Sequence, residues 1–308
     1  MNVKSEKERI GEVAMKASKE AELEATFRKI EGDWKQAKLE VAPYKDYKDY
    51  FIVSSTEEIN ELLEDSLVTL SNVLAARFVD NIRFEVDRFY RKLTYLETLL
   101  DEWLTCQKSW MYLETIFNSP DIQKSLASDT KKFMQVDSVW KQTMKGVNDN
   151  PLAMRAINYG KDKKESLLDL FRQNNMLLDQ IQKALDQYLE KKRTDFSRFF
   201  FLSNDELLLI LAEANRNPDT VQPHLRKLFE NIQRIEFGED IRSEDIVGIS
   251  SAEEEKIALM RSIKTRDPVE RWLLNLESEM VRTVRRAIKV ALDEQESSEE
   301  NFNRPRWV

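Results

Sequence analysis

Residues 82–117 of the chain, IRFEVDRFYRKLTYLETLLDEWLTCQKSWMYLETIF, decide its fold. Spacings of four and three separate a series of residues in this stretch that are all apolar except for one glutamine: Ile82, Val86, Phe89, Leu93, Leu96, Leu100, Trp103, Gln107 and Trp110. This heptad spacing predicts one long amphipathic helix. A helix of about 36 residues is roughly 54 Å long, and few compact enzymes need a helix of that length.

The composition of the whole chain favours the same mainly α fold class. Of its 308 residues, 6 are glycine and 7 are proline. Sheet-rich folds need many tight turns, and tight turns use these two residues, so their scarcity predicts long helices with few joints. Because 41% of the residues are hydrophobic, the chain has enough apolar material for a core. We expect an elongated stack of helical bundles.

Local signals place further elements around the central stretch. Helices are expected over 1–27, 55–76, 121–144 (in shorter pieces), 167–189, 203–214, 219–233 and 267–296. Capping-box patterns begin at Ser55, Ser203 and Asp267, and Asp137 is expected to be a further cap. Residues 34–51 are expected to be irregular. Apolar residues that alternate with polar ones predict a small β-hairpin near 234–259.

The net charge and the cysteine content of the chain limit which partners and which cellular compartment are expected. The net charge is −8, whereas a nucleic-acid-binding protein is usually basic. Cys106 is the single cysteine, and a large chain without a disulfide suits the reducing cytosol. No apolar run approaches the roughly 20 residues that cross a bilayer. We therefore expect a cytoplasmic protein whose partners include neither nucleic acid nor a membrane.

The motifs of an autonomous enzyme are absent from the sequence. The phosphate loop GxxxxGK[ST] is missing, and no two glycines are close enough to form GxGxxG. His224 is the single histidine, so a zinc site is not expected and His224 is interpreted as an ordinary helix residue. Cys106 is expected to be unreactive, and the carboxylates Asp205 and Glu206 are explained by helix capping. We predict no catalytic residue, no cofactor and no metal.

Two groups of side chains are candidates for docking on another protein surface. The first is a set of cations on the final predicted helix: Arg282, Arg285, Arg286 and Lys289. They suit an acidic surface, although a solvated face with glutamate partners is the alternative. The second is an aromatic cluster: Tyr44, Tyr47, Tyr50 and Phe51. Tyrosine is common at interfaces, but core packing explains this cluster equally well.

Breaks between predicted helices supply candidate hinges, since hinges are usually a few loop or element-terminal residues. The first break contains Asn118 and Pro120, because proline cannot continue a helix. The second, within 148–160, contains Asn150, Pro151 and Gly160. The chain is accordingly divided into a charged helix with a frayed end at 1–33, helical parts at 34–118 and 119–296, and a connection at 297–308.

Two stretches resemble the linker region that precedes the AAA+ motor ring in dynein heavy chains. Residues 99–117, LLDEWLTCQKSWMYLETIF, are similar to the linker pattern W…Q…W.YLE.IF. Residues 188–208, YLEKKRTDFSRFFFLSNDELL, are similar to YLE.KR..F.RF.FLS.DELL, with Ser197 and Asn204 in place of Pro and Asp. Shorter similarities continue in order to 304–308. The resemblance covers about 34–308 and leaves the first 30 residues unmatched.

The resemblance implies a function that spacing alone could not show. In dyneins this segment is a curved stack of helices across a six-module AAA+ ring, and it bends and straightens with ATP turnover to produce the power stroke along microtubules. It implies the ring of the same heavy chain as a partner, a tail and other subunits on the N-terminal side, and only indirect contact with microtubules. Residues 34–118 and 119–296 would be the two linker subdomains, and 297–308 would lead to the first AAA+ module.

Two questions remain open at the level of the sequence. Axonemal and cytoplasmic dyneins share these stretches, so the resemblance implies a cytoskeletal location without choosing between them. A static, spectrin-like helical spacer is the alternative function, because it too would need a long heptad helix. No internal repeat supports such an array.

Overall fold

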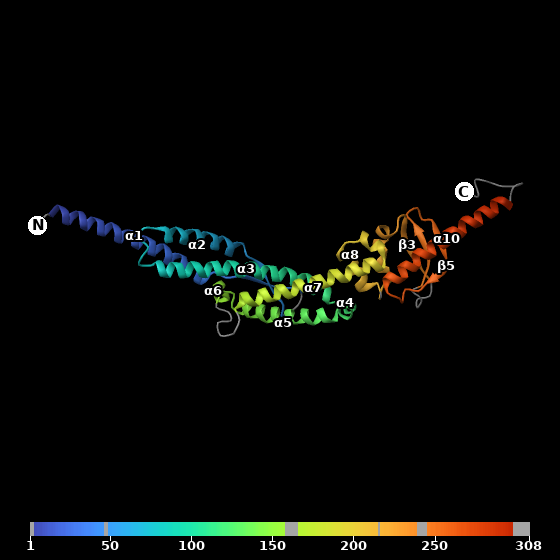
Figure 1. Cartoon of the computed structure of the whole chain (residues 1–308), viewed down its shortest axis with the longest axis horizontal. Helices are drawn as coiled ribbons and strands as arrows, with labels where there is room; N and C mark the ends of the chain where they lie inside the picture. Colours follow the sequence, from blue (N-terminus) through green and yellow to red (C-terminus); the bar gives the residue numbers. More distant parts are fainter. Residues whose placement is uncertain (1–2, 46–48, 158–165, 215, 239–244, 298–308) are drawn as a thin grey trace. The chain divides into compact units, whose positions relative to one another are not determined.

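The computed structural model describes residues 3–45, 49–157, 166–214, 216–238 and 245–297 (Figure 1). The chain divides into two compact units. Unit 1 comprises Met1–Thr115 and Ser128–Ile181, and unit 2 comprises Ile116–Ala127 and Gln182–Val308. Helices predominate in both, so the predicted mainly α fold class is confirmed. The subdomain boundaries expected from the sequence stay a prediction.

Unit 1 is built from helices and one small sheet. Its elements are α1 (Val3–Gln36), β1 (Glu40–Pro43), β2 (Phe51–Ser55), α2 (Glu57–Ala75), most of α3 (Arg83–Phe117), most of α5 (Ala127–Asp149), α6 (Ala153–Ala156) and the first half of α7 (Leu167–Asp195). The long helix expected over 82–117 is present as α3. The expected helix over 167–189 is present as α7 and extends six residues further, through the basic residues at its end.

The region between α1 and α2 differs from the sequence prediction. Residues 34–36 continue α1, and β1 and β2 form an antiparallel pair in which Val41 lies opposite Val53. The capping box expected at Ser55 is wrong, because Ser55 ends β2 and α2 begins at Glu57. The Ser55 hydroxyl accepts a bond of 3.3 Å from the Glu57 amide. Ser55 therefore pairs as a strand residue and is not the N-cap of α2.

Stacked aromatic rings join three helices in the core of unit 1. The rings of Trp110 on α3 and Trp140 on α5 stack at 5.2 Å between centroids. Trp103 stacks on Phe171 of α7 at 5.1 Å. All four side chains are fully buried. Such pairs add roughly 0.5–1.5 kcal/mol each beyond the burial of their area, so α3, α5 and α7 are fixed against one another.

Asp137 has a different role from the helix cap that the sequence predicted. It lies in the middle of α5. Its Oδ1 accepts a 3.1 Å hydrogen bond from the indole Nε1 of Trp110, and its Oδ2 lies 2.5 Å from the ammonium of Lys141. The prediction was wrong because Asp137 binds a buried indole on another helix, and such a contact leaves no local signal in the sequence.

The single polar residue of the heptad series, Gln107, holds β2 against α3. Its amide group is buried and makes two hydrogen bonds of 2.9 Å with the backbone of Val53, one accepted from the N–H and one donated to the C=O. A neighbouring strand would make the same pair of bonds. The glutamine therefore satisfies backbone groups that would otherwise be buried without partners.

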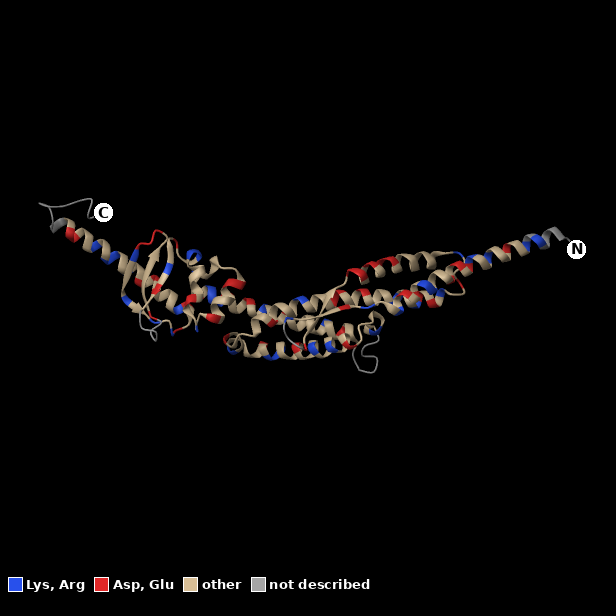
Figure 2. Cartoon of the chain, turned by 180° about the vertical axis from the view of Figure 1, so that it is seen from behind, with Lys and Arg blue, Asp and Glu red and all other residues tan. Residues whose placement is uncertain are grey.

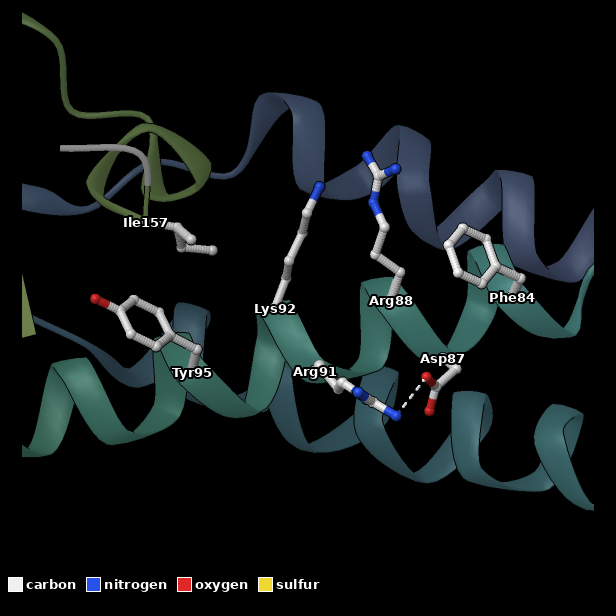
Figure 3. Close-up of a pocket in the computed structure, with 7 residues that line it drawn as sticks. All are labelled: Phe84, Asp87, Arg88, Arg91, Lys92, Tyr95 and Ile157. Atoms are coloured by element: carbon white, nitrogen blue, oxygen red, sulfur yellow. Dashed lines mark ion pairs between the residues drawn. The ribbon is translucent and has the colours of Figure 1, made fainter. Parts of the chain in front are cut away.

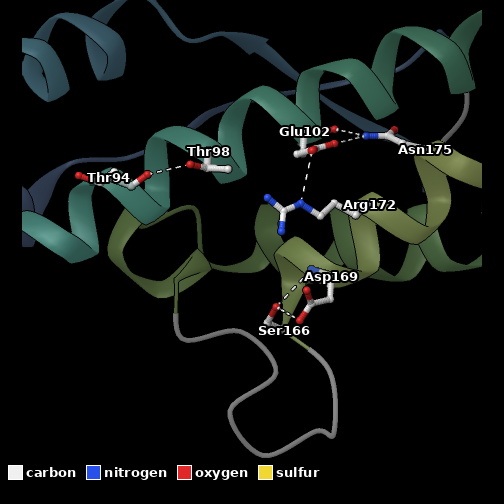
Figure 4. Close-up of polar contacts among 7 residues, drawn as sticks. All are labelled: Thr94, Thr98, Glu102, Ser166, Asp169, Arg172 and Asn175. Carbon is white, nitrogen blue, oxygen red and sulfur yellow. Dashed lines mark hydrogen bonds and ion pairs between the residues drawn. The ribbon is translucent and has the colours of Figure 1, made fainter.

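Figure 4 shows a polar contact between α3 and α7. The Glu102 carboxylate accepts hydrogen bonds from Asn175 Nδ2 at 2.7 Å and from Arg172 Nε at 3.4 Å. At the start of α7, the Ser166 hydroxyl accepts a bond of 3.2 Å from the Asp169 amide, as an N-cap does. The contact ties the beginning of α7 to the middle of α3.

Unit 2 combines short helices, a sheet and one long helix. Its elements are α4 (Pro120–Ser125), the second half of α7, the 3₁₀ segments η1 (Ser197–Phe201) and η2 (Pro218–His224), α8 (Asn204–Glu213), α9 (Leu225–Leu228), β3 (Ile232–Phe237), β4 (Ile246–Ser251), β5 (Lys256–Ile263) and α10 (Val269–Ser297). The capping box predicted at Ser203 is present, with both reciprocal bonds to Glu206.

The predicted β-hairpin near 234–259 is instead a three-stranded antiparallel sheet in the order β3-β4-β5, and it extends over 232–263. The helix expected to reach residue 233 was wrong, because α9 ends at Leu228 and Asn231 has a positive φ of 65° before β3. Asparagine tolerates this left-handed conformation, which ends helices. The sheet packs against α10, where Thr283 Oγ1 accepts a bond from the Met260 amide at 3.2 Å.

Replacing Gln107 with leucine is expected to lower the free energy of unfolding by about 1–3 kcal/mol, because the Val53 N–H and C=O would lose their buried partners. Urea denaturation measures the loss, and hydrogen exchange should locate it in β2. Gln180→Leu on the exposed side of α7 is the matched control and should change stability by less than about 0.5 kcal/mol. Equal stability of the two variants would contradict the role of Gln107.

Candidate docking surface and hinge segments

The single histidine lies beside a helix cap. His224 Nδ1 is 3.5 Å from Glu206 Oε1, and the same oxygen binds the Lys227 ammonium at 2.6 Å. The bond from Lys227, followed by the backbone bond at Ser203, lowers the pKa of Glu206 to about 2. The carboxylate is therefore held ionised as a cap and as an ion-pair partner, which agrees with the capping interpretation of Glu206.

The single cysteine is buried in α3. Burial, and secondly the charge of Glu102, raise the pKa of Cys106 to about 12. A thiolate is the reactive form of cysteine, so this thiol stays protonated at neutral pH. Within the described ranges, no three His, Cys, Asp or Glu side chains cluster as metal ligands would, and no helix is both long and apolar enough to cross a bilayer.

The four predicted docking cations lie on the C-terminal half of α10. Arg282, Arg285, Arg286 and Lys289 are all exposed. Figure 2 colours Lys and Arg positions blue, and blue segments recur along α10. Arg282 Nη1 lies 3.5 Å from the buried carboxylate of Glu279, one turn earlier. For the other three, no carboxylate within 4 Å is found among the described residues. The glutamate-paired alternative thus applies to Arg282 alone.

The same half of α10 also carries exposed apolar side chains that sequence analysis missed. They recur at spacings of three and four, with exposed fractions of 41–56%: Val281, Val284, Ile288 and Leu292. The earlier half of α10 instead buries Trp272 and Leu276 completely. The helix spacing could have revealed these residues, but only the structure shows that the chain leaves them uncovered. Cations beside an apolar stripe are typical of a helix that docks on a partner.

The two tyrosines of the predicted docking set have different outcomes in the structure. Tyr44 is only 7% exposed, and its ring lies 5.1 Å from that of Trp110. Its hydroxyl lies 3.5 Å from the buried carboxylate of Glu114. This position favours the alternative interpretation, core packing. Tyr47 lies outside the described residues.

The candidate hinge residues lie in different units. Asn118 and Pro120 belong to unit 2, where Pro120 begins α4 directly after α3 has ended at Phe117. Asn150 and Pro151 belong to unit 1 and follow α5. Gly160 lies outside the described residues. Helix α7 has residues in both units and is not interrupted where they meet, between 181 and 182.

Contacts that sequence analysis missed hold the first half of α10 in unit 2. Arg198 donates from Nε and Nη2 to Glu277 Oε1, at 3.0 and 2.9 Å, and from Nη1 to the Leu228 carbonyl at 2.9 Å. Lys192 of α7 pairs with Glu270 at the start of α10. Long-range ion pairs of this kind have no fixed spacing in the sequence, so only the fold identifies them.

The described residues define a class of mainly α-helical proteins built from two compact units. Residues 1–291 match the family described as dynein heavy chain, N-terminal region 2. The chain belongs to this family. The match begins at residue 1, which corrects the expectation that the first 30 residues have no counterpart in the family.

Three relatives are similar over most of the chain. Dynein axonemal heavy chain 6 of Homo sapiens is 42% identical over 299 residues, covering 92% of this chain. Dynein axonemal heavy chain 1 of Mus musculus is 39% identical over 292 residues, covering 95%. Dynein axonemal heavy chain 2 of Homo sapiens is 40% identical over 281 residues, covering 90%. The chain spans only 6–7% of the length of these relatives.

A double-mutant cycle on Arg198 and Glu277 should measure how strongly η1 is coupled to α10. Each single change to alanine is expected to destabilise unit 2, and the double variant should lose about 0.5–1.5 kcal/mol less than the sum, because the pair is partly exposed. Thermal unfolding measures the three variants. Arg198→Lys keeps the charge but lacks the fork of donors, so it should recover only part of the loss. Additive single effects would show that the pair is not coupled.

Proposed function

We propose that this chain is the mechanical linker of an axonemal dynein heavy chain, remodelled by ATP turnover in an adjacent AAA+ ring. The observation that carries the proposal is membership of the dynein heavy chain family over residues 1–291. The names of the three relatives support a ciliary or flagellar axoneme as the location. Nucleotide hydrolysis would belong to the ring, since the sequence carries no phosphate loop.

The helices support a role in transmitting force. Helix α3 has 35 residues, and α7 has 29 and contributes to both units. The aromatic core fixes these two helices to each other within unit 1. Closely packed interiors have low compressibility and transmit strain. A helix pair fixed in this way would pass a displacement along its length instead of absorbing it.

The partner of the exposed half of α10 would be the AAA+ ring of the same heavy chain. Its cations Arg285, Arg286 and Lys289 would meet acidic side chains of the ring, and the neighbouring apolar stripe would be buried on docking. Tyr47 stays a further candidate, whereas the burial of Tyr44 gives it no docking surface. The tail and other dynein subunits would lie on the N-terminal side, and microtubules would be reached only indirectly.

Binding of this chain to a dynein AAA+ ring that lacks its own linker tests the proposal. Affinity is expected to change by about tenfold between the nucleotide-free and ATP-analogue states, because a ligand can shift a conformational equilibrium only through differential affinity. Isothermal titration measures both states. Equal affinity in every state would indicate the static helical spacer instead.

Reversing charge on α10 should weaken ring binding specifically. Arg285→Glu combined with Arg286→Glu is expected to reduce affinity about tenfold and to reduce its dependence on salt. Lys124→Glu combined with Lys131→Glu makes the same charge change at exposed positions on α4 and α5, and is expected to leave affinity unchanged. If both double variants bind equally well, α10 is not the docking surface.

The break between α3 and α4 is our proposed hinge, because it lies directly after the longest helix among the described residues and is followed by Pro120. Cysteines at the exposed positions Thr115 and Lys124, joined by a bismaleimide, should abolish the nucleotide-dependent change in ring affinity. The buried Cys106 should not react. The same reagent across Lys131 and Gln135 within α5 is the control. Unchanged behaviour of the cross-linked chain would exclude this hinge.

A further inference from the structure

A groove of about 360 Å³ follows one side of α3, at the end of the helix away from α4. Its lining residues are Phe84, Asp87, Arg88, Arg91, Lys92 and Tyr95 of α3, and Ile157 directly after α6. In Figure 3, Phe84, Arg88 and Lys92 project from the same side of the helix, whereas Asp87 and Arg91 lie together on another side. The groove belongs to unit 1 alone.

The groove residues of α3 lie away from the core face of the helix. Residues 84, 88, 92 and 95 are separated by four, four and three positions, so they share one face of the helix. The core face is formed by other residues, among them the fully buried Val86, Leu93 and Leu96. Phe84 is 76% exposed. An apolar ring this exposed contributes little to the stability of its own unit.

Two cations in the groove have no acidic partner within 4 Å among the described residues. Asp87 already forms an ion pair with Arg91, since Arg91 Nη2 lies 2.9 Å from Asp87 Oδ2. Two acids line a neighbouring hollow with Arg88 and Lys92: Glu31 of α1 and Glu85 of α3. Both are bound by Arg28, at 3.2 and 3.0 Å. Arg88 and Lys92 are thus free to pair with a negatively charged group from outside the chain.

We propose that this groove binds an acidic helical segment of a partner protein. The apolar groups stand at its two ends, Phe84 at one and Tyr95 with Ile157 at the other, and the two cations lie between them. Tyr95 lies eleven positions after Phe84 on α3, which is about 16 Å along the helix. A partner helix with two apolar side chains eleven positions apart presents both on the same face, and carboxylates between them would reach Arg88 and Lys92.

This interaction is separate from ring docking through α10, because it uses a different unit and different side chains. Charge complementarity selects the partner: the groove carries three cations and one carboxylate, and that carboxylate is already paired. A basic segment would leave Arg88 and Lys92 facing like charges, which disfavours association. A purely apolar segment would leave both cations desolvated without a partner.

The probe is a fluorescent, alanine-based helical peptide with two leucines eleven positions apart and two glutamates between them. Fluorescence anisotropy at low salt with the full 308-residue chain is expected to show saturable binding. Arg88→Glu combined with Lys92→Glu should weaken it by about tenfold, and Phe84→Ala by about fivefold. Lys108→Glu, at an exposed position further along the same helix, is the charge control and should leave binding unchanged.

Peptides with glutamine for glutamate, or with alanine for leucine, should each bind at least about fivefold more weakly. Circular dichroism should show that every variant keeps the helix content of the unmodified chain. Absence of saturable binding, or equal binding by the Arg88→Glu and Lys92→Glu variant, would overturn the proposal. Sedimentation that reveals a dimer lost in Phe84→Ala would instead assign the groove to a second copy of this chain.

Discussion

The burial of α3 against α5 and α7 is the interaction on which unit 1 depends. Most helical stability in proteins comes from packing an apolar face, not from intrinsic propensity. Here Trp103 and Trp110 supply that face and are completely enclosed by Trp140 and Phe171. A two-stranded sheet is marginal by itself, and β1–β2 is held in place because Gln107 of the same helix bonds the backbone of β2.

The two halves of helix α10 differ: the first is packed in unit 2 and the second is exposed. The first half is fixed in unit 2 by buried Trp272 and Leu276 and by the ion pairs that Glu270 and Glu277 make with Lys192 and Arg198. The second half exposes cations beside an apolar stripe. A helix with one end packed can present the other end in a defined direction, which reduces the entropy lost when a partner binds.

Two features of the chain bear on its function: the family to which it belongs and its internal architecture. It contains long helices with few glycines. His224 Nδ1 lies 3.5 Å from Glu206, and Cys106 is buried with a raised pKa. Among the described residues, cations with no carboxylate within 4 Å occur both on α10 and in the groove of α3. We propose both as surfaces for acidic partners, one in each unit.

The sequence by itself determined the mainly α class, the bounds of α3, the capping box at Ser203 and the family, because these depend on local spacing or on specific local motifs. It did not determine the pairing of β1 with β2, the third strand of the sheet, or the role of Asp137. Each of these is stabilised by a residue of a distant element: Gln107 for β2, Thr283 for β5 and Trp110 for Asp137. Exposure is also a tertiary property: the sequence left Tyr44 open between docking and core packing, and packing alone decided that it is enclosed.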